Sequence, residues 1–347
     1  MHARSWVPER IRTAPPHEVI SVDVLSQVLR AVRLTGALYF EVSAAHPWVT
    51  VTPSMKQIGA TMMPSAEHVI PFHVILFGRC WAMPQDRSVE PSEVEAGDIV
   101  MFPFGESHVV TSDRNRWEGK ASELSFYAKA AASEAPFTLI TVGGDGQKAK
   151  FVCGYLGCDA SPFNPVLGAL PKMLVVKGQV GDNNGLMQQL LRAALDEKTN
   201  RKAGAETVLA RLSELMFVQA IRQHMDSLPA SSKSWLSGLR DEHIGKALQI
   251  IHTQPAACWT IASLARESGL SRSVFAERFT RFTGEAPMHY VGRWRMQLAA
   301  RLLATGASIG AAAQEVGYNS EAAFQRAFKK YVGVPPGEWR RKSKKVH

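Results

Sequence analysis

Hydrophobic residues follow three patterns along this chain. From about residue 20 to 176, short apolar runs such as HVIPFHVILFG and GDIVMFPFG alternate with Gly, Pro and Asp, which predicts the strands of an all-β sandwich or barrel. A Gly/Asn-rich linker is expected at 177–185. From Leu186 to Leu228 the apolar residues recur at helical spacing, and the region after it is predicted to be helical throughout.

The second helix of this middle region has a wide apolar face. Its members are Val208, Leu209, Leu212, Leu215, Met216, Ala220 and Ile221. Such a face either packs on the preceding β domain or forms a dimer seam, and the pattern favours neither alternative.

The C-terminal region contains an internal duplication. Segment 260–284 matches segment 308–333, with an offset of 48 residues up to a shared glycine and 49 residues after it. In each copy a short helix is followed by this glycine, Gly269 or Gly317, and then by a second helix. Because a tight turn between helices favours a positive φ, the spacing predicts two helix-turn-helix units.

The second helix of each unit is expected to bury one face and expose the other. The inward positions are Phe275, Phe279 and Phe282 in the first helix, and Phe324, Phe328 and Tyr331 in the second. The outward positions are Arg272, Ser273, Ala276, Glu277 and Thr280, and then Glu321, Ala322, Gln325, Arg326 and Lys329. We expect Ser271 to cap the first of these helices, and Asn319 or Ser320 the second. A helix with such an outer face can lie in a major groove.

The net charge of +9 lies entirely in this region. Residues 240–347 hold 17 Lys and Arg against 8 Asp and Glu, whereas the remaining residues hold 23 of each. A basic region joined to a neutral one is typical of a protein in which only one part meets the phosphate backbone. The alternative, a basic solubilising tail at 340–345, supplies only part of the excess.

Residues 240–341 resemble the DNA-binding domain of the AraC-type family of bacterial transcription regulators. The resemblance is carried by IASLARESGLSRSVFAERF, GEAPMHYV, WRMQLAARLL and VGYNSEAAFQRAFKKYVGVPPGEWR. It implies two helix-turn-helix units joined by a rigid helix, with both recognition helices in successive major grooves of double-stranded DNA. The base-reading positions that it implies are Ser273, Ala276, Glu277, Glu321, Ala322, Gln325 and Arg326. Arg272, Arg281, Lys329 and Lys330 are expected to contact phosphates.

The motif GDIVMFPFGESH at 97–108 fits the second motif of cupins, so the N-terminal region resembles the cupin-type sensor domain of a subset of this family. The first cupin motif, HxHxxxE, is absent. Instead His68 and His73, together with His108 and Cys80, are candidates for a site that holds zinc or another transition metal. The alternatives are a metal-free effector pocket and a purely structural role.

Cys153 and Cys158 form a C-x4-C pair around two glycines. In a Gly-containing loop they could approach within disulfide distance and sense oxidants; the alternative is two small buried hydrophobic side chains. Four cysteines, no apolar run long enough for a membrane span and no N-terminal signal sequence indicate a protein of the cytoplasm.

The expected domains are a cupin-like effector-sensing domain (1–176), a linker with dimerisation helices (177–235) and a DNA-binding domain (236–347). We expect a sequence-specific transcription regulator that is not an enzyme and whose cupin-like domain senses a small molecule, metal or oxidant. The resemblance implies an activator that acts as a homodimer and has RNA polymerase as a partner. Two alternatives remain: a metal-dependent cupin enzyme fused to a DNA-binding module, and an architectural protein that binds DNA without reading its sequence.

Overall fold

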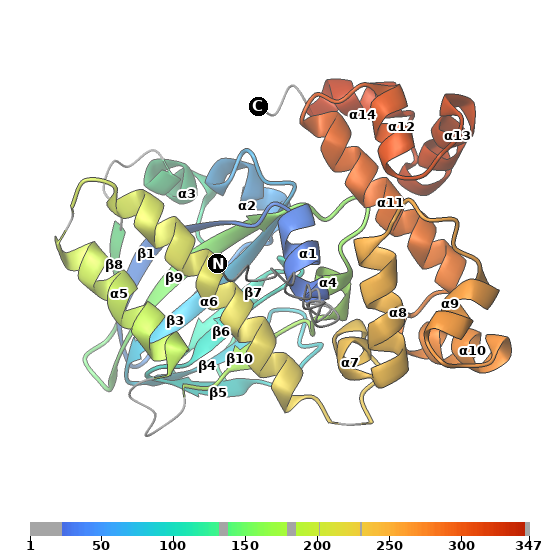
Figure 1. Cartoon of the computed structure of the whole chain (residues 1–347). Helices are drawn as coiled ribbons and strands as arrows, with labels where there is room; N and C mark the ends of the chain where they lie inside the picture. Colours follow the sequence, from blue (N-terminus) through green and yellow to red (C-terminus); the bar gives the residue numbers. More distant parts are fainter. Residues whose placement is uncertain (1–22, 132–137, 179–184, 201, 230, 344–347) are drawn as a thin grey trace, which may run out of the picture.

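The computed structural model describes residues 23–131, 138–178, 185–200, 202–229 and 231–343 (Figure 1). Most of the predicted linker at 177–185 and the last part of the basic tail lie outside these residues. In the described part of the chain, no helix is long and apolar enough to cross a membrane.

Two β-sheets form the N-terminal region, as the alternating pattern predicts. The larger sheet has the strand order β10-β6-β3-β9-β1-β8, and the smaller one has the order β2-β7-β4-β5. Neighbouring strands are antiparallel, except β1 and β8, which are parallel. The larger sheet contains β1 (Thr35–Ala45), β3 (His68–Phe77), β6 (Ile99–Met101), β8 (Thr138–Gly143), β9 (Lys148–Cys158) and β10 (Leu174–Val176). The smaller sheet contains β2 (Val49–Thr52), β4 (Arg79–Pro84), β5 (Ser92–Glu95) and β7 (His108–Thr111).

Side chains alternate between the two faces of the larger sheet because successive residues of a strand point in opposite directions. Ile75 and Phe151 face the smaller sheet and pack in one hydrophobic cluster with its Val110. Phe72 and Val74, one residue out of phase with Ile75, belong to a second cluster on the other face. Both faces of this sheet are therefore covered, which explains its continuous apolar runs.

The outer face of the larger sheet is covered by a helical hairpin of α5 (Leu186–Asn200) and α6 (Ala205–Ser227), which lies across the strands in Figure 1. Helix α6 approaches β1 closely at Gly36: a Cβ atom added to this glycine would lie 2.6 Å from the carbonyl oxygen of Ala210. Most of the predicted apolar face of α6 packs here, with Leu209, Met216, Ala220 and Ile221 buried. Val208 and Leu215 point away from this interface and are 42% and 52% exposed.

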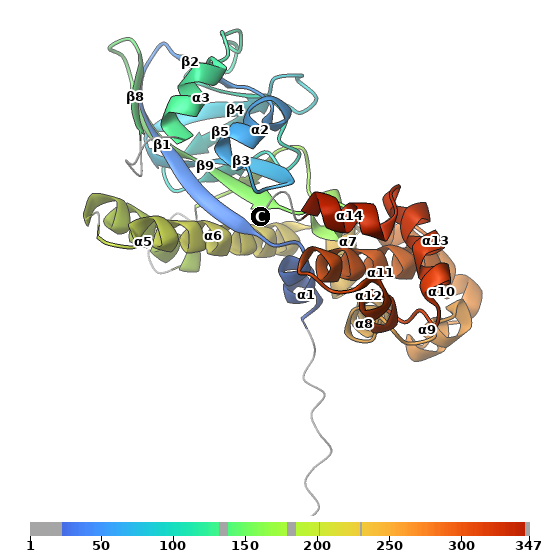
Figure 2. The same ribbon diagram turned by 90° about the horizontal axis from the view of Figure 1, so that it is seen from above.

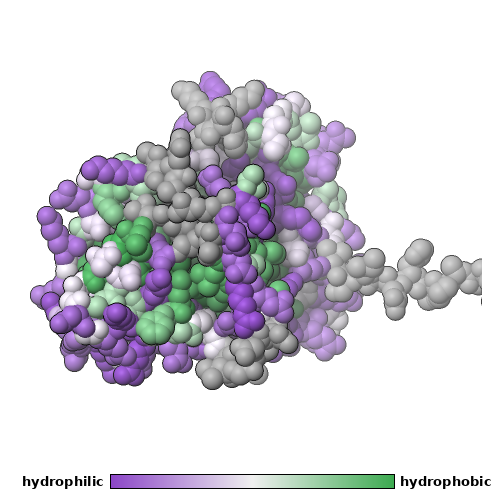
Figure 3. Space-filling view, turned by 90° about the vertical axis from the view of Figure 1, so that its left-hand side faces the viewer, coloured by the Kyte–Doolittle hydropathy of each residue, from purple (hydrophilic) through white to green (hydrophobic). Residues whose placement is uncertain are grey.

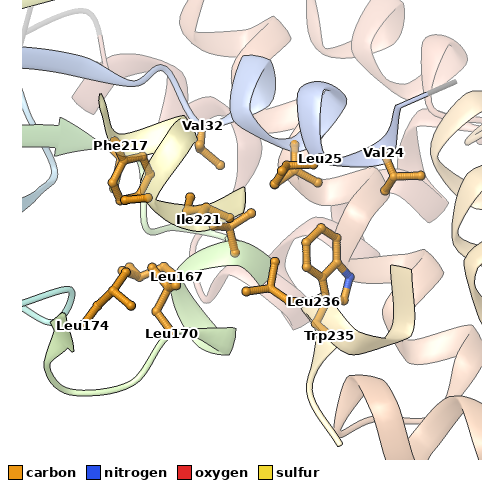
Figure 4. Packing of buried hydrophobic residues seen from close by; sticks show 14 of the residues in the cluster. Val24, Leu25, Val32, Leu167, Leu170, Leu174, Phe217, Ile221, Trp235 and Leu236 are labelled. Carbon is orange, nitrogen blue, oxygen red and sulfur yellow. The ribbon is translucent and has the colours of Figure 1, made fainter. Parts of the chain in front are cut away.

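Short helices complete the N-terminal region and join it to the C-terminal one. They are α1 (Val24–Ala31), α2 (Met55–Met62), α3 (Leu124–Ala131) and α4 (Pro165–Ala169). Figure 4 shows Leu25 of α1, Ile221 of α6 and Leu236 of the C-terminal region around a common apolar core. The two regions therefore share part of their hydrophobic core.

The C-terminal region is all helical, as predicted. Its helices are α7 (Trp235–Arg240), α8 (Glu242–Thr253), α9 (Ile261–Glu267), α10 (Arg272–Thr283), α11 (Pro287–Ala304), α12 (Ile309–Glu315), α13 (Glu321–Val332) and α14 (Pro336–Ser343). The helices α9–α10 and α12–α13 are the two helix-turn-helix units, and α11 connects them. The second unit has a hydrophobic cluster of its own, built with the C-terminal half of α11.

Candidate DNA-binding surface and buried histidine pair

The local signals of both helix-turn-helix units appear in the structure as predicted. Gly269 and Gly317 have positive φ values of 70° and 84°. The side chain of Ser271 accepts a hydrogen bond from the backbone N–H of Val274, and that of Ser320 accepts one from Ala323, at 3.1 Å. Each recognition helix therefore starts at a serine N-cap, and in the second unit the cap is Ser320, not Asn319.

Each recognition helix buries its aromatic side and exposes its opposite side. The phenylalanines at the inward positions of α10 and α13 are all buried. Tyr331 is half-buried and packs against the hydrophobic cluster of the second unit, so the prediction that it is buried is met in part. It lies against α11, where a Cβ on Gly292 would be 2.4 Å from its hydroxyl oxygen, and its ring faces His289.

The residues expected to read bases lie on the solvent side of the two helices. All of them are exposed except Ala276, which is half-buried. The Nε2 of Gln325 donates a hydrogen bond to the Oε1 of Glu321 at 2.9 Å, which holds both side chains over the same turn of α13. The expected phosphate-contacting residues Arg272, Arg281, Lys329 and Lys330 are exposed as well.

Both recognition helices lie on the side of the molecule away from the β-sheets (Figures 1 and 2). The connecting helix α11 has 18 residues, which corresponds to about 27 Å at 1.5 Å per residue. An ion pair between Arg278 and Asp241, with 2.6 Å between Nη2 and Oδ2, fastens α10 to the start of α8. The outer faces of α10 and α13 are therefore presented together by a rigid support.

One exposed residue of this surface, Val274, was not among the positions predicted from the sequence. Val274 lies in the first turn of α10 and is 48% exposed, an unusual position for a β-branched apolar side chain. Its position directly before the buried Phe275 could have indicated this exposure. Successive residues of a helix are rotated by about 100°, so the neighbour of a buried residue lies at the edge of the exposed face. An apolar side chain there suits contact with a thymine methyl group.

A pair of histidines lies buried between the two β-sheets. His73 on β3 and His108 on β7 are 2% and 0% exposed, and their Nε2 atoms are 2.8 Å apart. The Nδ1 of His73 is 3.0 Å from the Sγ of Cys153, and the Nδ1 of His108 is 3.1 Å from the carbonyl oxygen of Glu106. Burial lowers the pKa of His108 to about 4, and burial together with His108 lowers the pKa of His73 well below its ordinary value.

These three contacts form a row of hydrogen bonds that ends at the carbonyl oxygen of Glu106, and this carbonyl determines the direction of each bond. A carbonyl oxygen only accepts, so the neutral ring of His108 carries its proton on Nδ1 and accepts at Nε2. His73 therefore donates from Nε2 and accepts at Nδ1, where the thiol of Cys153 donates. Burial raises the pKa of this thiol, which keeps its proton in place.

This arrangement satisfies both rings without a metal ion. His68, by contrast, uses its Nε2 on the carbonyl oxygen of Pro103, at 2.7 Å, and does not join the pair. Cys80 is buried, and burial raises the pKa of its thiol to about 12. Within the described ranges, no three His, Cys, Asp or Glu side chains are arranged to hold a metal ion. The residues present fit hydrogen-bonded histidines better than a three-ligand centre, and metal binding stays a prediction.

The expectation that Cys153 and Cys158 lie in a loop is wrong. Both belong to β9, which pairs with β3 on one side and β1 on the other. Five residues of strand separate their Cα atoms by about 16 Å, whereas a disulfide requires less than about 7 Å. They point to opposite faces of the sheet, so they do not form a disulfide with each other in this fold. Burial raises the pKa of Cys158 to about 12.

A cleft of about 560 Å³ lies where the N-terminal region meets the DNA-binding region. Val24 and Leu25 of α1, Arg222 of α6 and Lys246 of α8 are among the residues that line it. The sequence did not reveal this cleft, because its walls come from four helices, α1, α6, α7 and α8, which belong to distant parts of the chain.

Comparison with known proteins agrees with this architecture. Residues 23–226 match the Cupin family, a range that includes α5 and α6, and residues 264–342 match a helix-turn-helix domain family. A putative AraC-like transcription regulator of Streptomyces lividans is 30% identical over 80% of this chain and 88% of that protein. A second one, from Streptomyces antibioticus, is 28% identical over 92% of this chain and 99% of that protein. The HTH-type transcriptional regulator AlkR of Acinetobacter baylyi is 28% identical over 93% and 100%, respectively.

A cupin domain joined to two helix-turn-helix units defines a DNA-binding transcription regulator, as the sequence predicts. The chain belongs to the AraC-type family of transcription regulators, in the subset with an N-terminal cupin domain. The domain boundaries expected at 176 and 235 stay predictions.

Proposed function

We propose that this regulator binds a specific operator with α10 and α13 in two successive major grooves of double-stranded DNA. The observation that carries this proposal is that both helices bury their aromatic side, start at a serine cap and leave the opposite side exposed. Both also lie on the side of the molecule away from the β-sheets (Figure 2). Successive grooves on one DNA face are about 34 Å apart, so the two helices have to act as one rigid unit. The single helix α11 connects the two helix-turn-helix units rigidly enough for this.

The two helices have different base-reading chemistry. On α13, Arg326 suits a bidentate contact with guanine, and the amide of Gln325 suits adenine. On α10, Ser273 can donate or accept a hydrogen bond and Glu277 can accept one, whereas Ala276 offers only a methyl group. We therefore assign most of the sequence discrimination to α13. Ala276, Glu321 and Ala322 complete the proposed base-reading set; Arg272, Arg281, Lys329 and Lys330 are the proposed phosphate contacts.

The experiment compares Arg326→Ala with Lys329→Ala on a selected operator and on unrelated DNA. Loss of a bidentate base contact is worth about 1–3 kcal/mol, or about 5-fold to 150-fold in affinity. Arg326→Ala should show this loss on the operator alone. Lys329→Ala should weaken binding on all DNA and lower the slope of log affinity against log salt concentration by about 1. Equal loss on both DNAs for Arg326→Ala would reassign this residue to phosphate.

We further propose that the cupin domain senses an effector, that the protein activates transcription through RNA polymerase in the cytoplasm, and that it works as a homodimer. Its relatives are transcription regulators, which supports a regulatory and not an enzymatic role. An effector acts only if its affinity differs between two states of the protein. The cleft at Arg222 and Lys246 is suited to this because both domains contribute to it. The His73–His108–Cys153 chain is the second candidate.

Exposed apolar side chains support the homodimer. Val208 and Leu215 lie on the outer side of α6, and Leu186 at the start of α5 is 47% exposed. Figure 3 shows apolar surface between polar residues on the face viewed from the left-hand side of Figure 1, where α5 lies. Contiguous exposed apolar surface of this kind marks interfaces between proteins.

A further inference from the structure

A buried amide on α11 joins the two domains. Gln297 is 2% exposed. Its Oε1 accepts a hydrogen bond from the backbone N–H of Phe163 at 2.9 Å, and its Nε2 donates to the carbonyl oxygen of Ala31 at 3.2 Å. Both partners belong to the cupin domain and are 134 and 266 residues away in the sequence. One side chain of the connecting helix thus satisfies two backbone groups of the other domain.

These two backbone groups lie where regular structure ends. Ala31 is the last residue of α1, and the final carbonyl groups of a helix have no partner within it. Phe163 directly precedes Asn164, the N-cap of α4. A buried backbone group without a partner is unfavourable, so the separation of the two domains at this point requires water to replace Gln297.

Gln297 is one member of a stripe along α11 that contacts the cupin domain. Tyr290, Arg293 and Gln297 follow one another at spacings of three and four residues, which places them on one face of the helix. The ring of Phe163 meets that of Tyr290 edge-on, with 5.2 Å between centroids. The guanidinium group of Arg293 lies 4.2 Å above the same ring. Three side chains along two turns of α11 therefore hold the segment that contains Phe163.

The same helix supports both DNA-reading units. The ring of Tyr290 meets that of Phe279 in α10 edge-on, with 5.5 Å between centroids. Met296 and Leu303 are buried in the cluster of the second unit. The orientation of α11 on the cupin domain consequently sets the direction of α10 and α13. The docked cupin domain does not cover these helices, which lie on the opposite side (Figures 1 and 2).

We propose that Gln297 is a positioning residue: it fixes the DNA-binding domain on the cupin domain and thereby determines the half-site spacing that a dimer of this chain can bind. The proposal rests on the proposed function, in particular on the homodimer. Two linked binding modules gain affinity from each other only when the geometry allows both to engage at once. A rigid joint permits this at one spacing, whereas a loose joint permits it at several.

The experiment uses the full-length protein and DNA that carries either one selected half-site or two half-sites at spacings that differ by half and whole helical turns. Gln297→Leu has a similar volume and loses both hydrogen bonds. Gln297→Glu keeps the acceptor for Phe163 but has no donor for Ala31. The control is Arg301→Ala, at an exposed position of the same helix.

The wild-type protein should bind its best spacing at least about tenfold more tightly than the others, and Gln297→Leu should bind all of them within about threefold. Gln297→Glu should fall between the two, and Arg301→Ala should keep the wild-type preference. Affinity for a single half-site should be the same for wild type and both Gln297 variants. Hydrogen exchange at the amide of Phe163 should be faster in Gln297→Leu.

An unchanged spacing preference in Gln297→Leu, with the amide of Phe163 exchanging faster, would overturn the proposal. So would a wild-type protein with no spacing preference. An equal loss on single and paired half-sites, with a lower melting temperature, would show a folding defect and contradict a positioning role. Failure of the wild-type protein to select any DNA sequence would instead refute the proposed function itself.

Discussion

The two turn glycines of the duplicated units have different surroundings, although they occupy equivalent positions in the sequence. A Cβ at Gly269 would have its nearest neighbour, the Nδ1 of His243, at 3.8 Å, which is ordinary contact. A Cβ at Gly317 would lie 2.4 Å from the carbonyl oxygen of Ala256 and 2.7 Å from its Cα. These are backbone atoms, so they cannot give way as the end of a side chain can.

The different surroundings predict unequal effects of the same substitution. At both positions alanine has to adopt a positive φ, at a cost of about 1–2 kcal/mol. Gly269→Ala should lower the free energy of unfolding by about this amount. Gly317→Ala adds the strain of overpacking, typically about 1–3 kcal/mol, and should lower it by about 2–5 kcal/mol in total.

Thermal unfolding of the full-length protein, followed by circular dichroism, measures the difference. Gly204→Ala is the matched control, because Gly204 has a φ of 86° and, among the described residues, no neighbouring atom within 4 Å of where its Cβ would lie. It should behave like Gly269→Ala. If Gly269→Ala lowers the melting temperature as much as Gly317→Ala does, the reasoning from the close approach of Ala256 is refuted.

Three further predictions concern buried groups. Burial lowers the pKa of His252 to about 3, so between pH 6.5 and 3 the unfolded chain binds a proton that the folded one does not. The free energy of unfolding should therefore fall on acidification by about 1.4 kcal/mol per pH unit for this residue, and urea unfolding at pH 7, 6 and 5 should show a shallower slope for His252→Gln. Cys153→Ala should lower the free energy of unfolding by about 1–3 kcal/mol because it leaves the Nδ1 of His73 without a donor, whereas Cys153→Ser should lower it by less. If chemical unfolding shows the same decrease for both variants, the thiol of Cys153 is not the donor to His73. A thiol reagent should label the exposed Cys258 quickly and the other three cysteines only on unfolding. Fast labelling of Cys153 in the native protein would contradict this prediction and support a role of Cys153 in sensing oxidants.

Local signals made the DNA-binding surface predictable from the sequence. The glycines, the serine caps and the phenylalanines at helical spacing all act within a few residues, and the duplication showed each signal twice. Tyr331 is only half-buried; it lies in the last turn of α13, beside Gly292 and His289 of α11. The cupin motif likewise located His108, since strand, turn and histidine are adjacent in the chain.

The interactions that sequence reasoning missed depend on contacts between distant segments. Cys153 meets His73 because of the register between β3 and β9, which no local pattern reveals. The glycines beside Cys153 suggested a loop, but here they occupy a central strand, where packing against both neighbours outweighs their low strand propensity. Gln297 looks like an ordinary polar position of a helix until Ala31, 266 residues earlier, is placed beside it.

The measurement that tests the central claim most directly is hydroxyl-radical footprinting of the full-length protein on its selected operator. If α10 and α13 enter successive major grooves, each bound site should show two protected segments on one face of the DNA, about one helical turn apart. Arg326→Ala should weaken the protection at one segment more than at the other. A single protected segment per site, or protection of the same extent on unrelated DNA, would contradict the account.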